Sequence, residues 1–360
     1  MDFAMGAQIP ESSIAIVALT RNGAGLALKI QSRMPGSICY VPERHEFALA
    51  MGARGFERIR SIIPKLWVEY RALVCIMATG IVVRQIGPLM RLKTVDPAVV
   101  VLDERGNFCI SLISGHMGGA NELARRVAAI TGGQAVITTA SDVLGKPALD
   151  LIAQNRGLEM ENIAQLKTVS RAILESEPLV VFDPHAILRQ DLSRVSRISW
   201  IDDDVSPPAR PQSPCVWVSE RLAPRDWSCL ILRPKNLVVG IGCNRNTPAE
   251  EILELVRMVF AEQRLAVQAI RNLASLDLKA DEPGLLETAA YLRRPVYFYP
   301  RSQVETEVVP NPSNQVMKHV GVPSVCEATA LLSAKKGVLI VPKRKTRNVT
   351  LAVVRADLSS

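Results

Sequence analysis

The chain has 360 residues, of which 48% are apolar and 22% charged, a composition typical of a folded globular protein large enough for two or three domains. Only 4% of the residues are aromatic, so the cores must be aliphatic, and the longest run without Asp, Glu, Lys or Arg, residues 106–121, is too short and too rich in glycine to cross a membrane. Lys and Arg exceed Asp and Glu by 43 to 35, and this net charge of +8 favours an anionic partner.

The first 148 residues alternate between strand and helix patterns. Apolar runs predict strands at 13–20, 72–79, 97–103, 108–113 and 135–139. Apolar spacing predicts helices at 24–30, 81–92 and 120–130, the last closed by Gly132 and Gly133 as a C-terminal cap. The third and fourth strands are separated by a short turn and are expected to form a hairpin. This alternation predicts an α/β domain over residues 1–148 with a mainly parallel, doubly wound sheet.

Residues 149–233 differ from the segments on either side. They contain helical stretches followed by a run between Asp202 and Pro214 that is dense in proline and charge. This composition predicts a small middle segment that ends in a surface loop or linker.

Residues 234–360 regain the pattern of a second, smaller α/β domain. A buried strand is predicted at 236–242, and capping boxes at Thr247–Glu250 and Ser324–Glu327 predict two helix starts, the first with Pro248 at the first helical position. Two late apolar runs, 337–341 and 348–355, are expected to pair as a hairpin. The tip of this hairpin is predicted to be basic, with Lys343, Arg344, Lys345 and Arg347.

Seven cysteines are scattered without a C-x-x-C pair, and no secretory signal precedes them. An odd number of cysteines on such a chain argues against a disulfide framework and against a zinc site, so most should be reduced and buried. We therefore expect a cytoplasmic protein without a metal site of its own. Because its basic residues are dispersed and aromatic residues are few, a small polyanionic ligand fits at least as well as nucleic acid.

The stretch S-L-I-S-G-H-M-G-G-A-N-E, residues 111–122, places a histidine among glycines where a predicted strand meets a predicted helix. Glycine turns at a helix start allow backbone N–H groups to approach an anionic or carbonyl oxygen. His116 would project into the same space as a general acid or base. The alternative is that the glycines, Gly115, Gly118 and Gly119, only permit a tight turn around a locally packed histidine.

Asn121 and Glu122 occupy the first turn of the helix that follows His116. They are candidate catalytic residues because they lie beside the histidine. Capping of the helix and interaction with its dipole would also explain both residues.

Basic residues near other glycine turns are candidates for substrate binding. Arginine and lysine hold carboxylates, although a solvated surface position is the more common outcome for any one of them. The turn G-I-G-C-N-R-N-T, residues 240–247, lacks the third glycine of the dinucleotide fingerprint, which disfavours a nucleotide-binding enzyme. The candidates outside the histidine turn are Gly80, Arg84, Lys93, Gly242, Arg245 and Lys345.

Several of these stretches occur together in one family. They are T-G-I-V-V-R, K-x-x-D-P-A-V-V-V-L-D-E-x-G, I-S-L-I-S-G-H-M-G-G-A-N-E-L-A-R-R, V-I-T-T-A-S-D, G-I-G-C-N-R-N-T, L-D-L-K-A-D-E-P-G-L-L, N-P-S-N-Q-V, V-C-E-A-T-A-L-L and K-R-K-T-R-N-V-T-L-A-V-V-R. In this order they resemble the CbiG family of cobalamin biosynthesis, the cobalt-precorrin-5A hydrolases. The resemblance spans residues 13–357 and is thinnest between 155 and 233.

The resemblance implies an enzyme that opens the δ-lactone of cobalt-precorrin-5A with water and releases acetaldehyde to give cobalt-precorrin-5B. The substrate is a polycarboxylate tetrapyrrole, which suits a basic protein with N–H-presenting turns. Cobalt would arrive inside the substrate, so no protein cofactor is expected. No membrane or nucleic-acid partner is expected, while transient contacts with neighbouring pathway enzymes and a homo-oligomer stay open.

The resemblance carries no residue-level catalytic assignment, so the expected mechanism rests on chemistry and position. His116 is expected to act as general base for water while turn N–H groups at residues 115–119 stabilise the oxyanion. The alternative is a non-catalytic tetrapyrrole-binding or carrier protein, which would keep the glycine turns and basic groups but need no general base.

Overall fold

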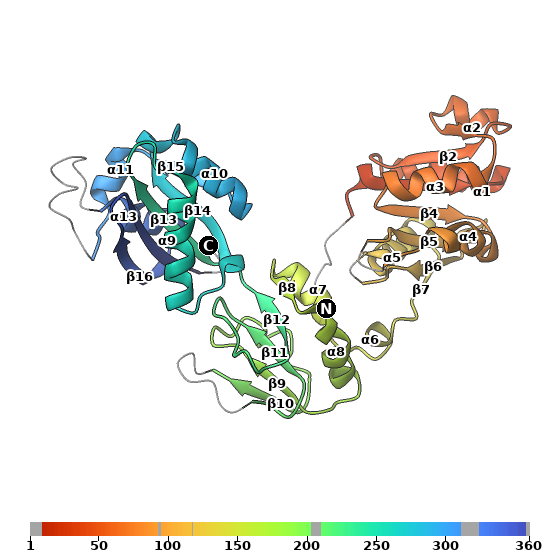
Figure 1. Cartoon of the computed structure of the whole chain (residues 1–360). Helices are drawn as coiled ribbons and strands as arrows, with labels where there is room; N and C mark the ends of the chain where they lie inside the picture. Colours follow the sequence, from red (N-terminus) through yellow and green to blue (C-terminus); the bar gives the residue numbers. More distant parts are fainter. Residues whose placement is uncertain (1–8, 93–94, 117, 203–209, 311–323, 358–360) are drawn as a thin grey trace. The chain divides into compact units, whose positions relative to one another are not determined.

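The computed structural model describes residues 9–92, 95–116, 118–202, 210–310 and 324–357, which form two compact units (Figure 1). The first unit runs to Arg156 and also includes Ser170–Glu177 and Asp191–Ser196; the second contains the other described residues. No helix in the described ranges is long and apolar enough to span a bilayer. Lys93, most of the proline-rich run and the N-P-S-N-Q-V stretch after Pro310 lie outside the described residues.

A seven-stranded sheet forms the centre of the first unit. Its strands are β1 (Ile14–Ala18), β2 (Ile38–Pro42), β3 (Arg54–Phe56), β4 (Ala72–Ile76), β5 (Ala98–Leu102), β6 (Phe108–Ile113) and β7 (Gln134–Val136). Their order is β3-β2-β1-β4-β5-β6-β7. All neighbouring strands are parallel except β5 and β6, which form the predicted hairpin.

Helices cover both faces of this sheet. The helices of the first 156 residues are α1 (Arg21–Arg33), α2 (Glu46–Ala50), α3 (Ile59–Glu69), α4 (Thr79–Ile86), α5 (Ala120–Thr131), α6 (Ala140–Val143) and α7 (Leu149–Asn155), with 3-10 turns η1 (Glu11–Ser13) and η2 (Gly87–Leu89). Alternate residues of β1 point to opposite sides: Ile14 and Ile16 pack with α1 and α5, while Ala15 and Val17 pack with α3 and α4. The prediction of a doubly wound, mainly parallel sheet is confirmed.

The direction of β6 decides where the glycine-histidine turn lies. Because β6 runs antiparallel to β5, Ile113 pairs with Val99 at the amino end of β5. The turn after β6 therefore lies at the edge where β4 and β5 begin, and the turn after β4 lies at the opposite edge. β7 is parallel to β6, so the segment after β7 shares the edge of the histidine turn.

The middle of the chain forms a sheet that the sequence pattern did not predict. Its strands are β8 (Glu159–Glu161), β9 (Leu179–Phe182), β10 (Ile198–Ile201), β11 (Cys215–Val218) and β12 (Cys229–Arg233), in the order β10-β9-β11-β12-β8. Only β8 is antiparallel to its neighbour. The helical stretches that were predicted correspond to α7, the 3-10 turn η3 (Ile163–Gln165) and α8 (Leu166–Leu174).

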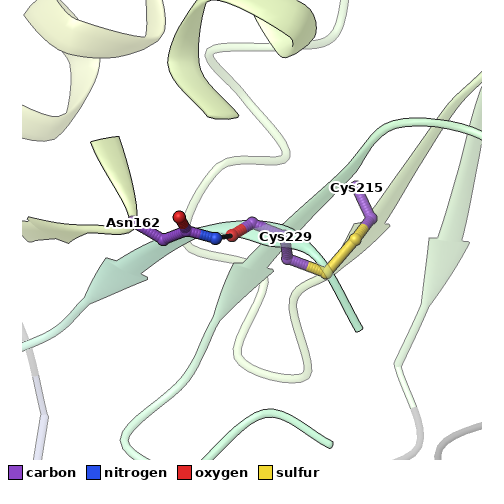
Figure 2. Close-up of a disulfide and its surroundings, with 3 residues drawn as sticks. All are labelled: Asn162, Cys215 and Cys229. Atoms are coloured by element: carbon purple, nitrogen blue, oxygen red, sulfur yellow. Dashed lines mark hydrogen bonds between the residues drawn. A yellow bond between two sulfur atoms is a disulfide. The ribbon is translucent and has the colours of Figure 1, made fainter. Parts of the chain in front are cut away.

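A disulfide joins two strands of the middle sheet, a pairing that the sequence did not predict (Figure 2). The expectation that most cysteines are reduced is confirmed for the other five. Cys215 and Cys229 are the first residues of β11 and β12 and lie directly opposite each other in the parallel pairing. Asn162 donates a hydrogen bond to the Cys229 carbonyl oxygen at 2.9 Å. The five remaining cysteines are free thiols, and four of them are buried.

A second five-stranded sheet lies in the C-terminal part of the chain. Its strands are β13 (Leu237–Cys243), β14 (Ile270–Leu276), β15 (Val296–Tyr299), β16 (Gly337–Lys345) and β17 (Val349–Ala356), in the order β15-β14-β13-β17-β16. The helices are α9 (Ala249–Glu262), α10 (Pro283–Leu292), α11 (Arg301–Thr306) and α13 (Val325–Ala334), with 3-10 turns η4 (Val267–Ala269) and η5 (Asp277–Lys279). Residues of α9 and α10 pack on one face and residues of α13 on the other. The predicted late hairpin is confirmed as β16 and β17, although Lys343–Lys345 belong to β16 itself.

Neither predicted capping box is formed. At the first, Pro248 is the N-cap of α9 and not its first residue, and the Thr247 hydroxyl donates to the Asn244 carbonyl oxygen. At the second, Ser324 makes no side-chain cap to α13, and Glu327 instead accepts a hydrogen bond from the Lys343 backbone N–H at 2.8 Å. A local turn bond replaces the first predicted box, and a contact with β16 replaces the second.

The close packing of α13 on β13 depends on Gly240. A Cβ atom at this position would lie 1.8 Å from the Cys326 carbonyl oxygen and 3.0 Å from the Ala330 Cβ. Gly240→Ala is expected to lower the free energy of unfolding by about 1–3 kcal/mol, because the helix must move away from the sheet. Urea unfolding measures this loss. Gly25→Ala is the matched control, since a Cβ at Gly25 would meet no atom within 4 Å, and equal stability of the two variants would contradict the prediction.

Candidate active site

The turn between β6 and α5 is held by backbone hydrogen bonds. Ala120 N–H donates to the Ser114 carbonyl oxygen at 3.1 Å, and Asn121 N–H donates to that of Gly115 at 3.0 Å. Glycine is required at Gly118, because a Cβ there would lie 2.6 Å from the Ser114 carbonyl oxygen, whereas a Cβ at Gly115 would meet only the Asn121 side chain. Gly119 is the N-cap of α5 with φ 84°, and Gly118 precedes it. The sequence thus predicted both the turn and the helix start correctly.

His116 projects from this turn toward the segment that follows β7. Its Nε2 lies 2.7 Å from the Asp142 Oδ2 and 3.0 Å from the Ser141 Oγ, both on α6. Its Nδ1 lies 3.8 Å from the Asp150 Oδ2 on α7. The side chains of His116, Asp142 and Asp150 are only 16%, 19% and 16% exposed, so these groups interact in a partly desolvated environment.

Asp142 is the centre of this cluster. Its Oδ2 also accepts a hydrogen bond from the Asn121 Nδ2 at 2.9 Å, and its Oδ1 accepts one from Arg125. Burial alone would raise the pKa of Asp142, but the hydrogen bonds from His116 and Arg125 outweigh it, and the pKa lies below its usual range. Asp142 is therefore a carboxylate that accepts three donors.

Of the two residues predicted beside the histidine, the structure brings one into its cluster. Asn121 is buried, and its Oδ1 accepts from the Ser111 hydroxyl at 2.7 Å, while its Nδ2 also donates to the Thr139 Oγ1 at 3.1 Å. It makes no side-chain cap to α5. The Glu122 Oε2 instead lies 3.6 Å from the Arg125 Nη1 along the helix. Glu122 therefore reaches the cluster only through Arg125, which donates to Asp142.

The candidates after β4 lie at the other edge of the sheet. Gly80 and Arg84 belong to α4, which follows the carboxyl end of β4, and the Arg84 guanidinium is exposed and donates to the Gly80 carbonyl oxygen at 3.3 Å. Since β4 and β6 are five and six residues long, about 15–20 Å of strand separates these residues from His116. One lactone-sized site cannot include both turns.

The remaining candidates belong to the second unit. Arg245 is exposed and forms an ion pair with Asp281, and its guanidinium donates to the Leu278 carbonyl oxygen at 2.7 Å. Gly242 lies in β13, and Lys345 is the exposed last residue of β16. Arg245 thus holds the turn after β14 in place in this unit.

Four residues of the histidine cluster were not predicted from the sequence: Arg125, Ser141, Asp142 and Asp150. The signal was the run T-T-A-S-D, residues 138–142, which follows a predicted strand. Carboxyl ends of neighbouring parallel strands meet at one edge, so the pairing of β6 with β7 would have placed this run beside His116. Among the described residues, no group of three or more His, Cys, Asp or Glu side chains is arranged to hold a metal ion.

Three family models match the chain. They are "Cobalamin synthesis G N-terminal" over residues 61–142, "Cobalamin biosynthesis central region" over 147–234 and "Cobalamin synthesis G C-terminus" over 237–354. The chain belongs to the CbiG family.

Two relatives that align over nearly their full length support this membership. The chain is 31% identical over 363 residues to a cobalt-precorrin-5A hydrolase of Priestia megaterium, covering 94% of both chains. It is 33% identical over 350 residues to a cobalt-precorrin-5A hydrolase of Salmonella typhimurium, covering 96% of this chain and 98% of the relative. A crystal structure of a cobalamin biosynthesis protein G homolog from Sulfolobus solfataricus matches with 21% identity and a TM-score of 0.36, covering 97% of this chain and 98% of that one.

The histidine cluster joins two of the regions that define the CbiG family. His116, Asn121 and Asp142 lie in the range matched by the N-terminal model, and Asp150 lies in the range matched by the central one. The candidate site of this CbiG chain therefore depends on sequence from both regions.

Proposed function

We propose that this chain hydrolyses cobalt-precorrin-5A. The reaction opens the δ-lactone with water and releases acetaldehyde, giving cobalt-precorrin-5B, as the family resemblance implies. Two relatives of this name align over nearly the whole chain at 31% and 33% identity. The single structural observation that carries the proposal is the partly buried His116, held between the carboxylates of Asp142 and Asp150.

His116 acts as the general base of this reaction. Lactone opening needs a group that takes a proton from water near neutral pH, and imidazole is the side chain best suited to this task. Asp142 orients the ring from one side. Gly115 and Gly118 of the glycine turn are our candidates for the backbone N–H groups that stabilise the growing negative charge on the carbonyl oxygen. The Gly119 N–H donates to the His116 carbonyl oxygen at 2.9 Å instead.

The substrate brings both the metal and the negative charge. Cobalt enters within the tetrapyrrole, so the protein needs no cofactor of its own for this step. The net charge of +8 favours a polycarboxylate ligand. Arg245 and Lys345 of the second unit are our candidates for carboxylate contacts, and the cytoplasm is the proposed compartment.

Anaerobic incubation of the purified protein with cobalt-precorrin-5A tests the proposal. Acetaldehyde should appear in a one-to-one ratio with consumed substrate, and the tetrapyrrole should show the matching change in mass. Tight binding of unchanged substrate would instead identify a carrier and overturn the proposal. The heat-denatured protein serves as the control for spontaneous lactone opening.

A further inference from the structure

The bonds around Asp142 determine which nitrogen of His116 carries a proton. Asp142 is a carboxylate and can only accept hydrogen bonds. Its Oδ2 lies 2.7 Å from the His116 Nε2, a hydrogen-bond distance. Two acceptors cannot share such a contact, so Nε2 must be the donor.

The side-chain amide of Asn121 can adopt only one orientation beside Asp142. If Asn121 were turned by 180°, its carbonyl oxygen would face the Asp142 Oδ2 at 2.9 Å, and two oxygen acceptors would oppose each other. In the observed orientation its Oδ1 accepts from the Ser111 hydroxyl. Asn121 and Arg125 thus keep Asp142 ionised and fixed in front of Nε2.

We propose that Asp142 is a positioning residue that holds the proton of neutral His116 on Nε2, so that Nδ1 is the nitrogen that accepts a proton during lactone opening. This proposal rests on the proposed function and assigns its base to one atom. Nδ1 lies 3.8 Å from the Asp150 Oδ2, which is beyond hydrogen-bond length. Its lone pair is therefore available, and Asp150 stabilises the imidazolium once it forms.

The same bonds exclude a serine nucleophile. Ser141 Oγ lies 3.0 Å from the His116 Nε2, and Asp150 lies on the Nδ1 side, an order that superficially matches a Ser-His-Asp triad. A triad requires Nε2 to accept the serine proton. Nε2 already carries a proton directed at Asp142, so the Ser141 hydroxyl is not activated, and water is the attacking group.

The proton and electron pairs balance through the step. A water O–H bond breaks, its proton moves to the His116 Nδ1, and the water oxygen forms the new bond to the lactone carbonyl carbon. The carbon–oxygen bond of the lactone then breaks, and the proton returns from Nδ1 to the departing alkoxide. His116 ends as it began, with its Nε2–H still bonded to Asp142.

Nitrogen NMR of the labelled histidines tests the proposal without any substrate. The chain has four histidines, so comparison with His116→Ala assigns the ring of interest. At a pH where this ring is neutral, His116 should show the Nε2–H tautomer in the wild-type protein and lose it in Asp142→Asn. An Nδ1–H tautomer in the wild-type protein would overturn the proposal whatever the enzyme turns over.

Kinetics of the same variant provide the second readout. Asp142→Asn can donate its amide N–H to Nε2 and move the proton to Nδ1, so kcat should fall by roughly 10²–10⁴ while KM changes less than about threefold. Asp226→Asn, an exposed aspartate of the second unit, is the charge-matched control and should retain wild-type kcat. Wild-type kcat in Asp142→Asn would contradict the proposal, while absence of turnover by the wild-type protein would contradict the proposed function instead.

Asp150 is tested by the pH dependence of the rate. The charged groups around the ring are Asp142 on α6, Asp150 on α7, and Arg125 with Glu122 on α5. Asp150→Asn removes the negative charge beside Nδ1 and disfavours the protonated ring, so the acidic limb of the kcat/KM profile should move to lower pH. A limb that stays in place or moves to higher pH would contradict the role of Asp150.

Discussion

Replacement of His116 by alanine is expected to lower kcat for cobalt-precorrin-5A by about 10²–10⁴, the usual contribution of a positioned general base. The ring occupies the turn between β6 and α5 and contacts Ser141 and Asp142 on α6. Without it, Asp142 cannot replace the base, because the hydrogen bonds from its donors hold the pKa of this carboxyl below its usual range. Acetaldehyde release under single-turnover conditions measures the loss.

The control for His116→Ala is His45→Ala. His45 is also partly buried, but its Nε2 contacts the Leu19 carbonyl oxygen after β1, at the opposite edge of the same sheet. This variant should keep wild-type kcat. Turnover by His116→Ala within about threefold of wild type, with substrate binding retained, would leave the histidine with only a structural role in its turn.

The sequence predicted the helices and strands around this site, but it did not predict which side chains surround His116. Strand and helix patterns predicted β1, α1, β5, β6 and α5, because apolar spacing reports directly on which side of an element is buried. The predicted hairpin of β5 and β6 already implied that β6 runs opposite to β4, and the structure confirms this pairing. The turn of His116 and the turn of Arg84 therefore lie at opposite edges of the sheet.

The sequence pattern also could not predict that Asp142 lies beside His116. It lies 26 residues beyond His116 in the chain, on a four-residue helix that has no periodicity of its own. Only the parallel pairing of β6 with β7 brings the two together. The run T-T-A-S-D was visible as a family mark, yet nothing local distinguishes its aspartate from a helix-capping residue.

The middle sheet was missed for a related reason. Its strands have three to five residues each, too few for a clear alternation of apolar and polar positions. The pairing of Cys215 with Cys229 follows from the register of β11 on β12, which the spacing of the two cysteines does not reveal. Five of the seven cysteines are free thiols, as expected for most of them, and this pair is the exception.

Reduction of the Cys215–Cys229 disulfide is expected to lower the free energy of unfolding of the middle sheet by about 3 kcal/mol, the loop-closure contribution for a loop of roughly 15 residues. The two cysteines (Figure 2) are 14 positions apart. Both are almost fully buried in a cluster with Phe182, Trp217 and Trp227. Urea unfolding followed by tryptophan fluorescence measures the loss, because three of the four tryptophans lie in the second unit.

A matched pair of variants separates the disulfide from other effects of a reducing agent. The double variant Cys215→Ala and Cys229→Ala should unfold at the same urea concentration with and without dithiothreitol, whereas Cys243→Ala, which alters a free thiol, should respond to dithiothreitol like the wild-type protein. Denatured wild-type protein should titrate with five free thiols, and seven would contradict the disulfide. Because reducing conditions open most disulfides, a stability difference of this size would make the folding of the middle sheet depend on the thiol balance of its surroundings.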